Sequence, residues 1–207
     1  IYNGFKIKAG YGGPATREEI SGVENYLDFV EKSYHRLKEK YNLSLEALVK
    51  KNMVKYVDLK DIYKEDLSTK FDIDKINSSG LKVLYDPMYG SGQGFFKNFI
   101  SSFDEIHGSY NPSFNGTNPE PLAVNCTDTI ELIRSQKYDL GIINDGDADR
   151  IGAIDENGNF VSTQQLFPIF LKYLKENTDL DGDVIKTVSV SDHVARICEK
   201  HNLLYHE

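Results

Sequence analysis

The stretch LGIINDGDADRIGAIDENG, residues 140–158, decides how the fold of this chain is interpreted. An apolar run, LGII, is followed one residue later by three aspartates at alternate positions, Asp145, Asp147 and Asp149, and then by Arg150. Ligands of open parallel sheets collect beyond the carboxyl ends of the strands. Converging carboxylates repel one another, and hard oxygen ligands favour Mg²⁺, Mn²⁺ or Ca²⁺ over Zn²⁺. The stretch therefore predicts a strand that ends in a metal site.

The segments on either side of this stretch alternate between strand and helix patterns. Apolar runs predict buried strands, and longer periodic runs predict helices between them; the strands are expected at 81–86, 105–110 and 138–144, and the helices at 94–103 and 124–136. This alternation indicates βαβ units with right-handed crossovers. After the aspartates, two short apolar runs joined around Asn157-Gly158 predict a hairpin with a type I′ turn. The fold class is α/β, with a mixed, mainly parallel sheet and flanking helices.

The two ends of the chain have patterns of their own. Thr16 and Glu19 form a T-x-x-E capping box, and a stripe of apolar residues from Ile20 to Leu37 predicts a helix that faces a core. After it, the sequence predicts a helix at 44–51, a weak strand pattern at 53–59 and one or two short helices within 60–78. Beyond the hairpin, it predicts a helix at 163–176, a strand at 183–191 and a helix at 192–200.

Composition excludes several classes of protein. The net charge of −8 makes binding to nucleic acid or to an anionic membrane improbable. No apolar run approaches the ~18 residues that a membrane span requires, so the cytosol is the expected location. Cys126 and Cys198, far apart in the sequence, are expected to be buried thiols in a reducing compartment. The chain does not begin with Met, and we expect it to be a piece of a longer protein.

Three other interpretations of the aspartate cluster are open at this point. D-G-D-A-D-R is a polar turn in the simplest of them. An EF-hand loop would use Asp145, Asp147, Asp149 and Glu156, although it needs Gly where Arg150 stands and helices on both sides. A phosphatase of the haloacid dehalogenase type would use Asp145 and Asp147, but it expects Thr or Val at the position of Asp149.

Four segments together resemble the α-D-phosphohexomutase superfamily, which includes phosphoglucomutase, phosphomannomutase and phosphoglucosamine mutase. DGDADR at 145–150 matches the metal loop of that family, D-G-D-[AG]-D-R. YNGFKIKAGYGG at 2–13 is similar to the segment after the family's phosphoserine loop. YDPMYGSGQ at 85–93 and FNGTNPEP at 114–121 resemble two further family loops, in the same order.

The resemblance implies a division of the chain into parts of three domains. Residues 1–66 would be the carboxyl-terminal part of domain 1, residues 67–157 the complete metal-binding domain 2, and residues 158–207 the start of domain 3. The phosphoserine would lie before Ile1. The sugar-recognition loop and domain 4 would lie beyond Glu207, so the isolated chain is expected to be inactive.

The resemblance also implies a reaction and roles for individual residues. The family's isomerases interconvert hexose 1-phosphates and 6-phosphates through a phosphoserine and a bisphosphorylated sugar. Asp145, Asp147 and Asp149 would hold Mg²⁺, with the phosphoserine as its remaining protein ligand. Arg150 and Lys6 would be the catalytic residues, Lys6 as a proton-transfer group or electrostatic aid. The form of Y-N-G-F-K favours glucose or mannose phosphates over glucosamine phosphate, and no pattern indicates the oligomeric state.

Overall fold

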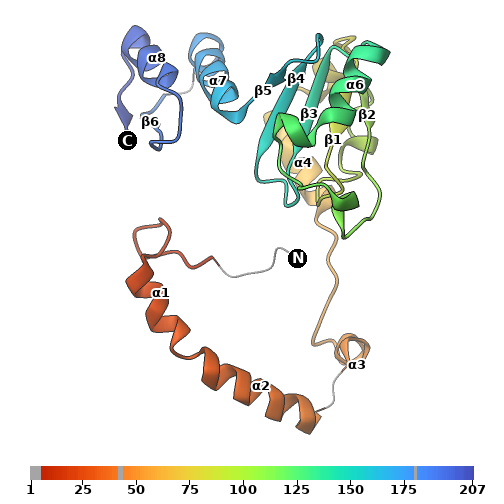
Figure 1. Ribbon diagram of the computed structural model, residues 1–207, viewed down its shortest axis with the longest axis vertical. Helices are drawn as coiled ribbons and strands as arrows, with labels where there is room; N and C mark the ends of the chain where they lie inside the picture. The colour runs from red at the N-terminus through yellow and green to blue at the C-terminus, as the bar shows by residue number, and fades with distance from the viewer. Residues whose placement is uncertain (1–5, 42–43, 180) are drawn as a thin grey trace. The chain divides into compact units, whose positions relative to one another are not determined.

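The computed structural model describes residues 6–41, 44–179 and 181–207. These separate into two compact units, Ile1–Leu59 and Lys60–Glu207 (Figure 1). Each unit is described by itself below. The aspartate cluster lies in the second unit.

The second unit is built on a five-stranded sheet with the order β2-β1-β3-β4-β5 (Figure 1). The strands are β1 (Val83–Asp86), β2 (Phe103–Glu105), β3 (Leu140–Asn144), β4 (Ile151–Asp155) and β5 (Phe160–Val161). β2, β1 and β3 run parallel, whereas β4 and β5 are added antiparallel to β3. The predicted α/β fold with a mixed, mainly parallel sheet is confirmed.

Helix α6 (Thr127–Gln136) covers one face of this sheet (Figure 1). Its buried Ile133 packs into a core whose other fully or nearly buried members come from the strands and the loops around them: Leu84, Met88, Cys126, Tyr138, Ile143 and Ile154. Residues alternate between the faces of a strand, so Tyr85 points away from this core, and its ring contacts Phe96 with 4.8 Å between centroids. An aromatic segment therefore covers the other face.

That aromatic segment corrects one prediction. A helix was expected over residues 94–103, but only the short 3₁₀-helix η1 (Phe96–Asn98) forms there. Gly94 has φ +70°, and its N–H donates to both carboxylate oxygens of Glu105, at 3.0 and 3.1 Å. Glycine and phenylalanine have lower helix propensity than alanine. Ring contacts of Phe95 with Phe96 and with Phe99 also favour the compact 3₁₀ conformation over an α-helix.

The predicted hairpin after the aspartates is present, but its turn type was wrong. β4 and β5 pair antiparallel around residues 156–159. Gly158 has φ +75°, whereas Asn157 is not in the left-handed region that a type I′ turn requires. Asp155 determines this shape, because its carboxylate accepts from the N–H groups of Asn157 and Asn159 at 3.0 and 2.7 Å. The turn is closed by the side chain of Asp155.

Further helices precede and follow the strands of this sheet along the chain. They are α4 (Lys60–Lys70), α5 (Ile73–Asn77), α7 (Thr163–Asn177) and α8 (His193–His201). The strand expected at 183–191 is reduced to β6 (Val184–Ile185), which pairs parallel with β7 (Tyr205–His206). Val184, Val194 and Cys198 form a second small core. Both cysteines are free and buried, as predicted, and burial raises the pKa of the Cys126 thiol to about 12.

The described residues of the first unit form a tight turn and three helices. Residues 7–15 form the turn, with the Ala15 N–H donating to the Ile7 carbonyl at 3.0 Å. The predicted capping box is present at the start of α1 (Arg17–Glu24), followed by α2 (Leu27–Tyr41) and α3 (Leu45–Lys50). The strand pattern expected at 53–59 forms no strand, and the segment at 1–5 lies outside the described residues.

The apolar stripe of this unit is exposed, contrary to the expectation that it faces a core. Val23, Leu27, Val30 and Tyr34 all remain at least half exposed, and the chain breaks between α1 and α2 instead of forming one helix. In the described part of the chain, none of the helices has the length and apolar character of a bilayer span.

Candidate metal centre

Three loops meet at the carboxyl edge of the parallel strands. They are the turn after β1 at 87–94, the loop at 114–121 and the aspartate loop at 145–150. Gly146 joins them: its N–H donates to the Pro119 carbonyl at 3.1 Å, and its own carbonyl accepts from the Ser91 N–H at 3.0 Å. A Cβ atom at Gly90 would lie 2.6 Å from the Gly146 carbonyl oxygen. Only glycine at position 90 permits this approach.

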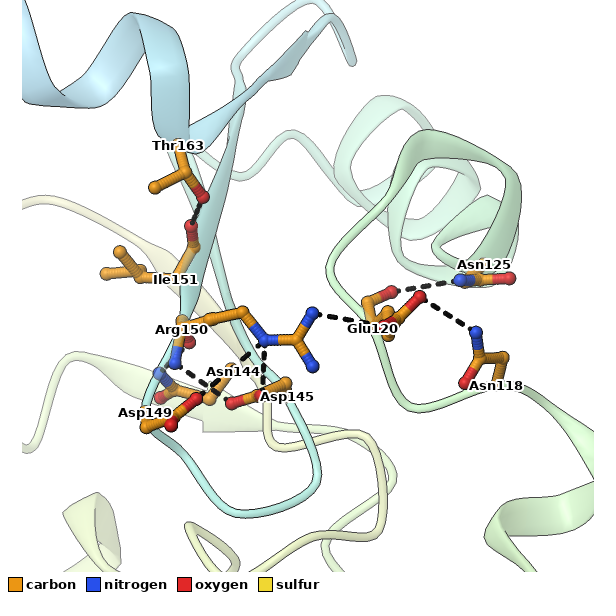
Figure 2. A network of polar contacts seen from close by, with 9 residues as sticks. All are labelled: Asn118, Glu120, Asn125, Asn144, Asp145, Asp149, Arg150, Ile151 and Thr163. Carbon is orange, nitrogen blue, oxygen red and sulfur yellow. Dashed lines mark hydrogen bonds and ion pairs between the residues drawn. The ribbon is translucent and has the colours of Figure 1, made fainter. Parts of the chain in front are cut away.

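The base of the aspartate loop is closed by side chains of the sheet and by Thr163 at the start of α7. Asn144, at the end of β3, donates through Nδ2 to the Arg150 carbonyl at 2.8 Å. Its Oδ1 accepts from the Tyr85 hydroxyl at 3.0 Å. At the start of β4, the Thr163 hydroxyl donates to the Ile151 carbonyl at 2.6 Å (Figure 2). The strands therefore determine where the loop begins and ends.

Asp145 is fully buried, and it holds Arg150 at two points (Figure 2). The Arg150 backbone N–H donates to Oδ1 at 3.0 Å, and the guanidinium Nε donates to Oδ2 at 2.7 Å. Burial by itself raises the pKa of Asp145, but the hydrogen bonds from Arg150 outweigh it, and the net pKa is lowered. Asp145 is thus a carboxylate at neutral pH.

Asp147 and Asp149 are exposed and lie beside Asp145. One ligand oxygen from each of the three aspartates falls within 4.8 Å of the other two. A hydrogen bond with Asp145, burial, and the negative charges of Asp145 and Asp149 all raise the pKa of Asp147. Ala148 between them has φ +61°, so the backbone is strained where the loop turns. The loop holds carboxylates together although they repel one another.

Negative charge is concentrated around the cluster. Three carboxylates approach the Arg150 guanidinium: Asp145 at 2.7 Å, Glu120 at 3.1 Å and Asp149 at 3.7 Å. Asp147 adds another carboxylate beside Asp145 and Asp149. A bound cation would lessen the repulsion between these groups.

The donor set fits a hard divalent cation. Three carboxylates suit Mg²⁺, which binds oxygen at about 2.1 Å, so that no two ligands can stand more than about 4.2 Å apart. The oxygens at up to 4.8 Å therefore need to approach only slightly on binding. A carboxylate oxygen has two lone pairs, so Asp145 can bind a cation while it still accepts from Arg150.

The structure brings together most of the predicted site residues. Among the described residues, the carboxylate group that could hold a metal consists of Asp145, Asp147 and Asp149, and Arg150 adjoins it. Lys6 belongs to the first unit, and its role stays a prediction. Glu156, which an EF-hand would need, lies in the turn after β4. The loop is flanked by β3 and β4, and an EF-hand requires helices there.

Glu120 is a site residue that the sequence interpretation missed. Its Oε1 accepts from Arg150 Nη1 at 3.1 Å, across 30 residues of sequence. The signal that could have pointed to it is its place between Pro119 and Pro121 in one of the quoted loops. Charged residues held between two prolines have little backbone freedom.

A second buried aspartate, Asp86 at the end of β1, was also missed. Its carboxylate accepts from the Met88 N–H at 2.8 Å, from the Thr129 hydroxyl at 2.5 Å, and contacts His107 Nδ1 at 3.1 Å. The hydrogen bond to Asp86 raises the pKa of His107, although burial opposes it. A cavity of about 100 Å³ adjoins His107, and five of its lining residues have positive φ: Met88, Tyr89, His107, Phe114 and Asn115.

The fold and site define an α/β domain with a cluster of three carboxylates at the carboxyl edge of its sheet. Residues 61–158 match the family model described as phosphoglucomutase/phosphomannomutase, alpha/beta/alpha domain II. The family model covers slightly less than half of the chain, and together with the relatives below it places this domain in the α-D-phosphohexomutase superfamily.

Individual relatives agree with this assignment. The phosphoglucosamine/phosphogalactosamine mutase of Sulfurisphaera tokodaii is 27% identical over 208 residues, covering 98% of this chain and 44% of that protein. The phosphoglucomutase of Komagataeibacter xylinus is 24% identical, covering 95% of this chain and 38% of that protein. The chain thus spans about two fifths of the length of these curated relatives.

A solved structure shows the same fold. The phosphoglucomutase/phosphomannomutase family protein from Burkholderia thailandensis superposes with a TM-score of 0.61 at 20% identity, covering 73% of this chain and 33% of that chain. At this level of identity the similarity concerns the fold.

Proposed function

We propose that this chain is the metal-binding part of a phosphohexomutase, which interconverts hexose 1-phosphates and hexose 6-phosphates through a phosphoserine and a bisphosphorylated sugar. One observation carries the proposal: three carboxylates converge beside a guanidinium that two of the neighbouring acids hold in place. Superfamily membership supports it, because the relatives bear the names of mutases.

The residues of the loop have separate tasks in this proposal. Asp145, Asp147 and Asp149 would hold Mg²⁺, which supplies positive charge to the oxygens of a transferring phosphoryl group. The buried Asp145 also fixes Arg150, whose side chain is 51% exposed and whose guanidinium can bind a phosphate oxygen. Phosphoryl transfer depends mainly on positioning and on charge neutralisation, and the loop provides both. Lys6 is proposed as a proton-transfer or electrostatic group.

We propose glucose and mannose phosphates as the substrates. The Y-N-G-F-K form of the first motif supports this choice. The names of the relatives include phosphoglucomutase and phosphoglucosamine/phosphogalactosamine mutase, so glucosamine 1-phosphate belongs in the same experiment.

A mutase assay tests the proposal. The full-length protein that carries this chain should convert glucose 1-phosphate or mannose 1-phosphate to the 6-phosphate in the presence of Mg²⁺. Asp147→Ala should lower the rate by at least about a hundredfold, because even loss of an outer partner of a metal ligand costs about 10- to 100-fold. The 207-residue chain by itself should be inactive.

Asp128→Ala is the matched control. Its side chain is 74% exposed, lies on α6 and is not among the clustered aspartates, so the rate should stay within about twofold. Absence of turnover with all three sugar phosphates would refute the mutase function. Full activity of Asp147→Ala would refute the metal loop and leave the mutase function standing.

A further inference from the structure

Glu120 is held from several sides in the loop at 114–121. Its carboxylate Oε2 accepts from Asn118 Nδ2 at 2.9 Å, and its backbone carbonyl accepts from Asn125 Nδ2 at 3.0 Å (Figure 2). The flanking Pro119 and Pro121 are buried. Oε1 is thereby directed at Arg150, and the Glu120 side chain is only 34% exposed.

Two carboxylates bind the Arg150 guanidinium through different nitrogen atoms. Asp145 binds its Nε at 2.7 Å, and Glu120 binds its Nη1 at 3.1 Å. The guanidinium is planar, so two contacts on different nitrogens determine the direction of the whole group. Within the described part of the chain, Arg150 donates hydrogen bonds through its backbone N–H, Nε and Nη1, and none through Nη2. This donor is available to a ligand.

The two acids differ in what they contribute. The Arg150 side chain contacts Asp145 through Nε, and this single contact still lets the planar guanidinium tilt about the hydrogen bond, which would move both terminal nitrogens. Asp149 is a competing partner, because its carboxylate lies 3.7 Å from Nε. Without Glu120, Arg150 would be free to turn its charge toward Asp149, away from an incoming phosphate.

We propose that Glu120 is a positioning residue, which acts through Arg150 by holding the guanidinium so that Nη2 faces the phosphoryl group of the substrate. This inference rests on the proposed mutase function. It extends the site to the loop at 114–121 and gives the N-P-E-P sequence there a chemical task beyond packing.

A double-mutant cycle in the full-length protein tests this role. Contacting residues that work as a pair are energetically coupled, and an effect of about tenfold in rate lies within the range measured for such pairs. Glu120→Ala should therefore lower kcat about tenfold, with KM for the sugar phosphate within about twofold, because the contact matters most during transfer. In the Arg150→Ala background, the same change should lower kcat less than about twofold.

Two further variants separate positioning from folding. Glu120→Gln keeps the shape and one acceptor oxygen, so its kcat should fall less than that of Glu120→Ala. Glu131→Ala, an exposed glutamate on α6, should leave kcat and KM unchanged. Equal losses from Glu120→Ala in both backgrounds, or a loss that appears only in KM, would overturn the inference. An inactive wild type would refute the proposed function itself and this inference with it.

Discussion

Two buried aspartates stand at the carboxyl ends of neighbouring parallel strands, and they have opposite surroundings. Asp86 ends β1 and is 1% exposed, and Asp145 follows β3 and is 0% exposed. Asp86 is surrounded by donors: the Met88 N–H, the Thr129 hydroxyl and His107. Asp145 has Arg150 on one side and two exposed aspartates on the other.

The difference shows that burial by itself does not mark a functional carboxylate. Asp86 has its hydrogen bonds satisfied within the protein, and it ties the turn after β1 to α6. Asp145 belongs to a group of three clustered carboxylates, which a bound cation would stabilise. The first aspartate is expected to matter for stability and the second for binding.

The largest expected effect is on stability, at Asp86. Asp86→Ala should destabilise the domain by about 3–5 kcal/mol, because it leaves the Met88 N–H and the Thr129 hydroxyl buried without an acceptor. Hydrogen exchange of β1 and β3 peptides in the full-length protein, followed by mass spectrometry, measures this loss locally. Asp128→Ala is the control and should change protection little. Equal protection in the two variants would contradict the stabilising role of Asp86.

The second largest effect is the gain in stability when Mg²⁺ binds to the clustered aspartates Asp145, Asp147 and Asp149. Mg²⁺ at a hundred times its Kd should stabilise the wild-type protein by about 2.7 kcal/mol, measured as a rise in the thermal unfolding midpoint. Asp147→Asn should abolish this response, because it removes one of the three clustered carboxylates. In the absence of metal, the same variant should unfold no earlier than wild type, since a repulsion has been removed. A full Mg²⁺ response in Asp147→Asn would show that the cation binds elsewhere.

The smallest effect is the dependence of stability on pH near His107. The hydrogen bond to Asp86 raises the pKa of His107 above its ordinary 6.5, and the Asp128 carboxylate at 3.8 Å contributes in the same direction. The stabilisation is therefore complete below pH 6.5 and is lost as the pH rises through the raised pKa. Unfolding midpoints between pH 6 and pH 8 should decline more in wild type than in His107→Gln. Parallel declines would mean that His107 does not titrate in this range.

Much of the fold could be predicted because its helices and strands follow from local sequence patterns. The capping box at Thr16 and the helices predicted within 60–78 and at 163–176 follow from hydrogen-bonding side chains and periodicity over a few residues. The segment at 94–103 could not be predicted in this way. Its path depends on Glu105 and on ring packing against Tyr85, which are contacts between separate elements.

The sequence by itself determined the α/β class and the aspartates, because strand patterns and the spacing of Asp145, Asp147 and Asp149 are properties of short stretches. Only the tertiary structure decided that Glu120 reaches Arg150 across 30 residues, and that Asp86 meets Thr129 across 43. Sheet order and loop packing bring such residues together, and no local sequence pattern indicates which distant side chains will lie at the same edge of the sheet. The physical reason is that a charge pair or hydrogen bond needs a distance of about 3 Å in space, which separation along the chain does not determine.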